Sequence, residues 1–163
     1  MRVLGIDASL RSTGLAVIEQ VGGSVRLLEM DTVKISASAP HSQCLAELWT
    51  RLTALIARQQ PEAAAIEGGF FFKNAKIAMI LGEVRGAAIA ACATANIPIW
   101  EYPPRRVKQA LTGWGAAPKD QVARMVVSVL GLESAPQEDA ADAISLALCH
   151  LNSRSPLLAE KPL

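Results

Sequence analysis

The sequence predicts a single α/β domain in which a mixed five-stranded sheet is flanked by helices. Three short apolar segments with strand character open the chain, and after them segments with helical spacing alternate with two further strand-like segments. Consecutive strands followed by helix–strand alternation indicate a sheet of mixed direction. The chain has 163 residues, 51% of them apolar, which is enough for one core. We expect this domain to span residues 1–153 and residues 154–163 to form a frayed tail.

The first half of the chain supplies four of the predicted strands and one helix. Gly22-Gly23 is typical of a hairpin turn between the second and third strands. The next segment carries apolar residues at helical spacing, with Trp49 in the apolar stripe, and Pro61 ends it. The expected elements are strands over Arg2–Asp7, Thr13–Gln20, Ser24–Lys34 and Ala63–Glu67, and a helix over Ser42–Gln59.

The second half begins with a long apolar segment, for which a membrane span has to be considered. Its window from Ile77 to Ile97 contains Glu83, Arg85 and several small residues, so a buried Ala-rich helix fits it better. The expected elements are helices over Asn74–Ala95, Arg105–Leu111, Lys119–Leu130 and Gln137–Asn152, and a last strand over Ile97–Tyr102.

Composition excludes some classes of site and leaves others open. The formal net charge of +1 neither proposes nor excludes a nucleic-acid partner. Cys44, Cys92 and Cys149 stand singly, without the paired spacing of a zinc site. No signal peptide is recognised at the start, so we expect a reducing, cytoplasmic environment.

Four acidic residues stand out by their positions. Asp7 ends the first strand and Glu67 ends the short fourth strand. Asp139 and Asp142 are three residues apart, on one face of an otherwise apolar last helix. Carboxylates gathered beside a core would repel one another and call for a cation. Their oxygens suit Mg²⁺ or Mn²⁺, and four can hold two ions, as in phosphodiester hydrolysis.

Each of these acids also has an ordinary structural interpretation. An acid at a strand end often only solvates that end, and Asp139 near a helix start favours the helix dipole. The joint pattern of two acidic strand ends and an Asp-x-x-Asp helix favours a catalytic site, although the sequence does not show that the four converge.

Several short motifs follow one another in a characteristic order from residue 3 to about residue 150. They are Gly5-Ile6-Asp7, Thr13-Gly14, Ala65-Ile66-Glu67, Phe70, Lys73-Asn74-Ala75, Arg85-Gly86-Ala87, Val107-Lys108-Gln109, Lys119, Gln121-Val122 and Asp139-Ala140-Ala141-Asp142-Ala143. In order and approximate spacing these motifs resemble the RuvC family of Holliday junction endonucleases. This resemblance implies a ribonuclease H-like fold, a homodimer, and paired nicks across a four-way DNA junction that leave ligatable ends in recombination and repair. It places the metal-binding and catalytic carboxylates at the same four positions.

The chain also departs from the family pattern. Ala8-Ser9 stands where the family commonly has Pro-Gly, and two glycines follow Glu67 where larger residues are expected. The proposed ligands are intact, so these departures concern the branch of the family and the sequence preference for cutting. The resemblance leaves a branch-migration helicase complex open as a further partner.

Basic residues are concentrated in the middle of the chain. Residues 68–130 contain eight Lys or Arg and three Asp or Glu, whereas the remainder contains eight and twelve. Such a distribution can neutralise phosphates in a chain that is nearly neutral, although a solvated surface is the ordinary interpretation. The candidate DNA contacts are Lys73, Arg105, Lys108 and Lys119, of which the last two match basic positions of the family.

Aromatic residues add one candidate contact. Phe70 follows Glu67 after two glycines and matches the family's aromatic that stacks on an unpaired base at the junction centre. A Phe run is more often core. Trp114 fits either a loop anchor or a DNA contact, and the lone His150 is interpreted as structural.

Two other functions compete with the nuclease. A nucleotide-binding domain of the actin and sugar-kinase type has a similar first strand and hairpin, but it needs a second domain and leaves the Asp-x-x-Asp helix unexplained. A junction-binding protein without catalysis is the second alternative, and the four intact carboxylates disfavour it. For the nuclease, a two-fold substrate calls for two related sites and so for a dimer. The apolar helix from about Ile77 to Ala95 has more small apolar surface than one sheet face needs, so it is the candidate dimer interface.

Overall fold

The computed structural model describes residues 1–68, 74–153 and 161–163. In these residues a five-stranded sheet runs in the order β3-β2-β1-β4-β5. The strands β1, β2 and β3 pair antiparallel, and β1, β4 and β5 pair parallel. The predicted mixed sheet is therefore confirmed. The strands are β1 (Arg2–Asp7), β2 (Ser12–Val21), β3 (Ser24–Lys34), β4 (Ala63–Glu67) and β5 (Ile99–Tyr102).

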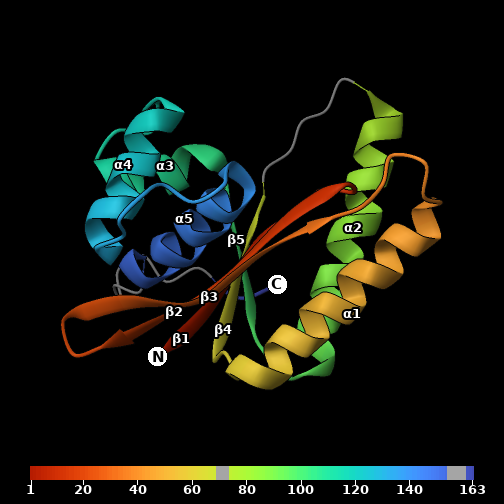
Figure 1. The fold of residues 1–163 in the computed structure, drawn as a ribbon, viewed down its shortest axis with the longest axis horizontal. Coiled ribbons are helices and arrows are strands. Elements are labelled where there is room, and N and C mark those ends of the chain that lie inside the picture. Colours follow the sequence, from red (N-terminus) through yellow and green to blue (C-terminus); the bar gives the residue numbers. More distant parts are fainter. Residues whose placement is uncertain (69–73, 154–160) are drawn as a thin grey trace.

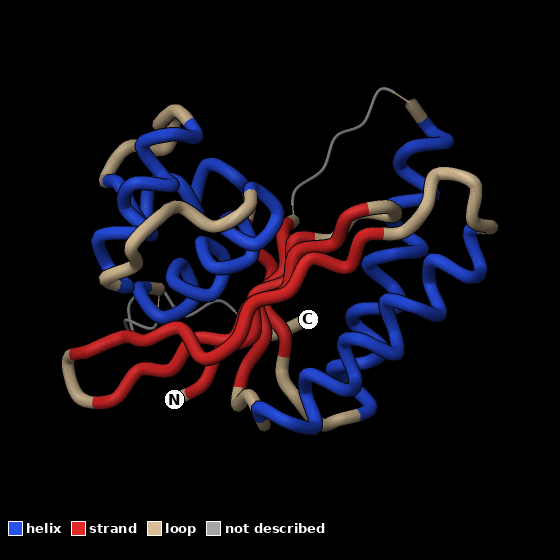
Figure 2. The backbone as a smooth tube through the Cα atoms, viewed as in Figure 1, coloured by secondary structure: helices blue, strands red, loops and turns tan. Residues whose placement is uncertain are grey.

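Helices cover both faces of the sheet. Figure 1 and Figure 2 show α3, α4 and α5 on one face and α1 and α2 on the other. Every described helix corresponds to a predicted one, with ends that differ by one residue at most. The helices are α1 (His41–Gln59), α2 (Ala75–Thr94), α3 (Pro104–Thr112), α4 (Lys119–Leu130) and α5 (Glu138–Asn152).

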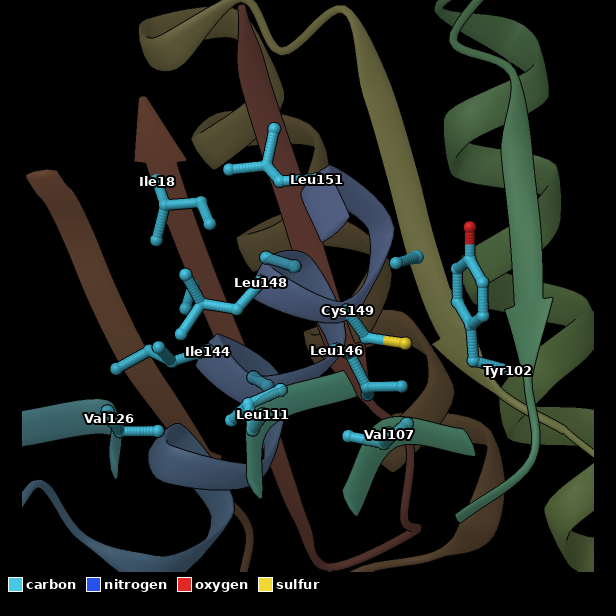
Figure 3. Packing of buried hydrophobic residues seen from close by; sticks show 14 of the residues in the cluster. Ile18, Tyr102, Val107, Leu111, Val126, Ile144, Leu146, Leu148, Cys149 and Leu151 are labelled. Atoms are coloured by element: carbon cyan, nitrogen blue, oxygen red, sulfur yellow. The ribbon is translucent and has the colours of Figure 1, made fainter. Parts of the chain in front are cut away.

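Two hydrophobic cores lie on opposite faces of the sheet, because side chains alternate along each strand. In β1, Val3 joins the core under α3, α4 and α5, whereas Leu4 and Ile6 join the core under α1 and α2. Figure 3 shows α5 at the centre of the first core, with Ile144 and Leu148 packed on the strands. The same alternation directs Asp7 toward the face that α5 covers.

The long helix α2 is less buried than its composition predicts. Val84, Ala88, Ala91 and Cys92 are its buried residues, and Met79 in its first half is 69% exposed. By length and composition alone α2 could cross a membrane. This is weak evidence for a membrane span, because a helix that packs on a sheet can pass the same test. The expectation of a buried helix is wrong for its first half, because no described segment of this chain covers that half.

Trp49 is a second correction. We expected it in the core stripe of α1, but its side chain is 37% exposed. The buried stripe of α1 includes Leu48 and Leu52, and position 49 lies about 100° around the helix from position 48, at the margin of the stripe.

The predicted tail is described at residues 161–163, where the Leu163 backbone N–H donates to the Ile99 carbonyl at 2.9 Å. Residues 154–160 lie outside the described residues, so the frayed tail stays a prediction. His150 is buried, and its Nδ1 lies 2.9 Å from the Tyr102 hydroxyl, which agrees with a structural role.

Candidate active site

Two of the four acids end neighbouring parallel strands. In the β1–β4 ladder Ile6 pairs with Ile66, so the next residues, Asp7 and Glu67, lie side by side at the same edge of the sheet. Both side chains are half-buried, and strand alternation directs both toward α5. A hydrophobic strand that ends in an acid thus places each carboxylate at the boundary between core and solvent.

The helix α5 lies directly on the sheet because two strand residues lack a side chain. A Cβ at Gly5 would lie 1.8 Å from the Ala143 carbonyl oxygen, and one at Gly14 would lie 1.9 Å from the Asp139 carbonyl oxygen. Gly14 is also the strand partner of Asp7. The close approach therefore brings the first turns of α5, with Asp139 and Asp142, beside the end of β1.

The four carboxylates share one electrostatic environment. Burial first, and then the charges of Asp142, Glu67 and Asp139, raise the pKa of Asp7 from 3.8 to about 7. Burial and the charge of Asp142 also raise the pKa of Glu67. The pKa of Asp142 is raised by burial first and by nearby carboxylates, against the lowering effect of Lys119. In the structure, each of the four acids that the sequence pattern predicted influences the pKa of at least one of the others or is influenced by it.

Burial is the largest cause of the raised carboxyl pKa values, and the charges of neighbouring carboxylates add to it. Among residues 1–68, 74–153 and 161–163, no three Asp, Glu, His or Cys side chains are close enough to hold an ion as they stand. The side chains must therefore turn toward a common point to bind one. The donor set itself, four carboxylates, fits a hard divalent cation such as Mg²⁺ or Mn²⁺.

Basic side chains line the same place. A cleft of about 220 Å³ is lined by Glu67, Asp142, Lys108 and Lys119, together with apolar residues of α3, α4 and α5. Lys119 is ion-paired with Glu138, and its Nζ lies 3.7 Å from an Asp142 carboxylate oxygen. Both lysines that the sequence singled out are thus at the site, and Lys119 already neutralises part of its charge.

The other predicted DNA contacts are placed less fully. Arg105 is exposed on α3, the same helix as Lys108. Phe70 and Lys73 lie outside the described residues, so their roles stay predictions. Trp114 is 57% exposed, and its backbone bonds to the Thr112 hydroxyl, which fits both of the roles left open for it.

Arg85 has a different place from the one that the charge distribution suggested. We counted it among the phosphate-neutralising residues, but its side chain is only 15% exposed. Its guanidinium hydrogen-bonds to the Glu67 carbonyl oxygen and pairs with Glu101 at 2.5 Å. A Cβ at Gly68 would overlap the Glu101 side chain, so the glycine after Glu67 leaves room for this pair. Arg85 therefore supports the end of β4 from α2.

Comparison with known proteins identifies the family of the chain. The sequence profile of the family "Crossover junction endodeoxyribonuclease RuvC" matches residues 3–150. The chain belongs to the RuvC family. RuvC of Caldicellulosiruptor saccharolyticus is 42% identical over 163 residues, covering 99% of this chain and 98% of that protein. RuvC of Chloroflexus aggregans is 44% identical over 151 residues, covering 92% of each.

Solved structures show the same relationship. The structure of Thermus thermophilus RuvC superposes with a TM-score of 0.89 at 38% identity, covering 100% of both chains. The RuvC of that organism in complex with a Holliday junction substrate superposes with a TM-score of 0.93, also at 38% identity, covering 100% of this chain and 99% of the other. The ribonuclease H-like fold that the RuvC resemblance implied is thereby confirmed.

Proposed function

We propose that this chain resolves four-way (Holliday) DNA junctions by paired, symmetric, metal-dependent nicks that leave ligatable ends. The convergence of four carboxylates from β1, β4 and α5 beside a cleft lined by Lys108 and Lys119 carries this proposal. Membership of the RuvC family and the superposition on a junction-bound RuvC support it. The substrate class is thus a branched DNA, and the reaction is phosphodiester hydrolysis.

Asp7, Glu67, Asp139 and Asp142 would hold the metal, which we propose is Mg²⁺ or Mn²⁺ with two ions in each site. When bound, such ions activate a water and stabilise the leaving oxygen of the phosphodiester. Asp7 and Glu67 are supported by adjacent strands, and the other two by the first turns of one helix, so the backbone positions are fixed and only the side chains would have to turn toward an ion. Lys119 limits the repulsion among the acids by its contact with Asp142.

The DNA backbone would lie along the basic rim of the cleft. Lys108 lines the cleft and forms no ion pair with a described residue, so its ammonium can contact a phosphate. We propose the same role for Arg105, exposed on the same helix, and for Lys119 and Lys73. Phe70 is proposed to stack on an unpaired base at the junction centre.

Symmetric nicking requires two active sites related by a two-fold axis, so we propose a homodimer. The exposed apolar first half of α2, with Ile77 and Met79, supplies a surface for the second subunit. As a further partner we propose a branch-migration helicase complex, as the family implies. We also propose a cytoplasmic location, because the cysteines are single and buried.

The experiment is cleavage of a synthetic four-way junction in Mg²⁺, compared with a duplex of the same sequence. We expect paired nicks in opposing strands, ends that a ligase can seal, and little duplex cleavage. Asp142→Asn should abolish cleavage and leave junction binding largely intact, because binding depends on phosphate contacts spread over a wide surface. The matched control is Asp120→Asn on α4, an exposed acid that pairs with Arg124 outside the cleft; it should cleave normally.

Two outcomes would overturn the proposal. If the single variants Asp142→Asn and Glu67→Gln both cleaved at the wild-type rate, the four acids would not be the active site. Tight junction binding by the wild-type chain without cleavage in either Mg²⁺ or Mn²⁺ would indicate the alternative, a junction-binding protein without catalysis.

A further inference from the structure

One face of β2 is directed at α5 from Ser12 to Ile18. Alternate residues of this strand share a face, and Ile18 and Ala16 belong to the core that α5 fills. The next residue on that face, Gly14, is the one whose missing side chain lets the Asp139 backbone approach. Ser12 follows on the same face, so its side chain is directed at the first turn of α5.

The Ser12 hydroxyl makes a specific contact there. Its Oγ donates a hydrogen bond to the Asp139 Oδ2 at 2.5 Å, across 127 residues of sequence. The turn before it fixes the serine: Ser9 Oγ donates to the Ser12 carbonyl at 3.1 Å. On the other face of the strand, Thr13 Oγ1 donates to the Ser9 carbonyl at 2.5 Å. This is the turn in which Ala8-Ser9 replaces the usual Pro-Gly of the family.

The contact opposes the repulsion among the acids. The charge of Asp139 raises the pKa of Asp7 and of Asp142, so these carboxylates push the Asp139 side chain away from the site. A hydrogen bond to an ionised carboxylate is among the stronger ones in proteins. It engages Oδ2 and leaves Oδ1 as the oxygen available to a cation.

We propose that Ser12 is a positioning residue, which holds the Asp139 carboxylate in the orientation that binds the divalent cation. The inference rests on the proposed function, in which Asp139 is a metal ligand. It assigns Ser12 no contact with the DNA or the reacting atoms. The hydroxyl is the essential feature, so threonine should replace serine and alanine should not.

The test is the affinity of the DNA-free protein for Mn²⁺, measured by electron paramagnetic resonance on wild type, Ser12→Ala and Ser12→Thr. We expect the dissociation constant to rise roughly tenfold in Ser12→Ala, because groups that orient metal ligands typically contribute that much to affinity. Ser12→Thr should return it to near the wild-type value. The matched control is Ser38→Ala, which removes a hydroxyl paired with Ser36 on an exposed loop and should change nothing.

Junction cleavage by the same variants separates positioning from general damage. Ser12→Ala should require more Mg²⁺ for half-maximal rate and approach the wild-type rate at saturation, with an unchanged melting temperature. Equal loss of Mn²⁺ affinity in the alanine and threonine variants would overturn the proposal, and so would unchanged affinity in both. If the wild-type chain bound Mn²⁺ in a Ser12-dependent way but cleaved no junction, the proposed function would fail and the role of Ser12 would stand.

Discussion

The helices α5 and α2 have similar compositions but occupy the protein differently. Both are apolar and rich in alanine, yet α5 buries eleven of its fifteen residues and α2 buries four of its twenty. In α5 the first and last residues are exposed, the acids Asp139 and Asp142 are half-buried, and every other residue is buried. In α2 the exposed positions include large apolar side chains. One helix therefore contributes acids to the candidate active site, and the other presents an apolar surface.

The glycines explain how this difference arises. Gly5 and Gly14 lie under α5 and allow its backbone to touch the sheet, whereas Gly82 and Gly86 lie in α2, and a Cβ at either would meet no described atom within 4 Å. The same residue type thus permits close packing in one layer and leaves open space in the other.

The largest expected effect on stability concerns Asp7 in the metal-free protein. Its pKa rises from 3.8 to about 7 on folding, so folding favours the protonated form. The stability that this provides is complete below about pH 4 and is lost as the pH rises toward 7, by at most about 4 kcal/mol. Urea unfolding with a chelator at pH 5 and pH 8 should show this loss in wild type and a smaller one in Asp7→Asn. Glu83→Gln, at an exposed acid of α2, should keep the wild-type dependence, and an unchanged slope in Asp7→Asn would contradict the account.

The next effect concerns the glycines. Gly5→Ala places a methyl group against the Ala143 carbonyl and should lower the free energy of unfolding by about 3 kcal/mol. Gly82→Ala on α2 should instead raise the free energy of unfolding of the isolated protomer by up to about 1 kcal/mol, because alanine favours the helix. Urea unfolding measures both. Equal effects of the two substitutions would show that α5 is not seated as closely as described.

Part of the candidate site could be predicted from the sequence and part could not. The acids at the ends of β1 and β4, and the i, i+3 pair on α5, were predicted because strand ends and helical spacing are local patterns. Ser12 and Arg85 were not recognised as supports of the site, since their partners Asp139 and Glu101 depend on how distant segments pack. The signal that was available for Ser12 is its position two residues before Gly14, which places the hydroxyl on the same face of the strand as the glycine. The apolar composition of α2 suggested an interface, but composition gives no information about which part of a helix is covered, so the exposure of its first half was not predicted.

A third prediction concerns the exposed half of α2. If a second subunit packs there, Met79→Asp should weaken dimerisation at least roughly tenfold, because it places a charge in an apolar interface. Light scattering across micromolar concentrations, with and without junction DNA, measures the change. Val129→Asp, at an apolar position of α4 that is 44% exposed, is the matched control and should leave the mass unchanged. A monomeric wild-type protein under all these conditions would refute the interface.

The smallest effect concerns phosphate contacts. Lys108→Ala should weaken junction binding modestly and reduce the slope of log affinity against log salt by about one unit. The control is Arg58→Ala on α1, which removes a positive charge paired with Glu29 of β3. It should change neither the affinity nor the salt slope. Fluorescence anisotropy at several salt concentrations measures both variants, and a wild-type slope in Lys108→Ala would remove this lysine from the DNA contacts.

If carboxylates from separate elements act as one metal-dependent site, the effects of substituting them should be non-additive. The measurement is the single-turnover rate of junction cleavage in Mg²⁺ for Asp7→Asn on β1, Asp142→Asn on α5 and the double variant. Groups that act as a unit lose nearly all function with the first substitution. We therefore expect the double variant to cleave as slowly as either single variant and no slower. Two partial losses that multiply in the double variant would contradict a shared site.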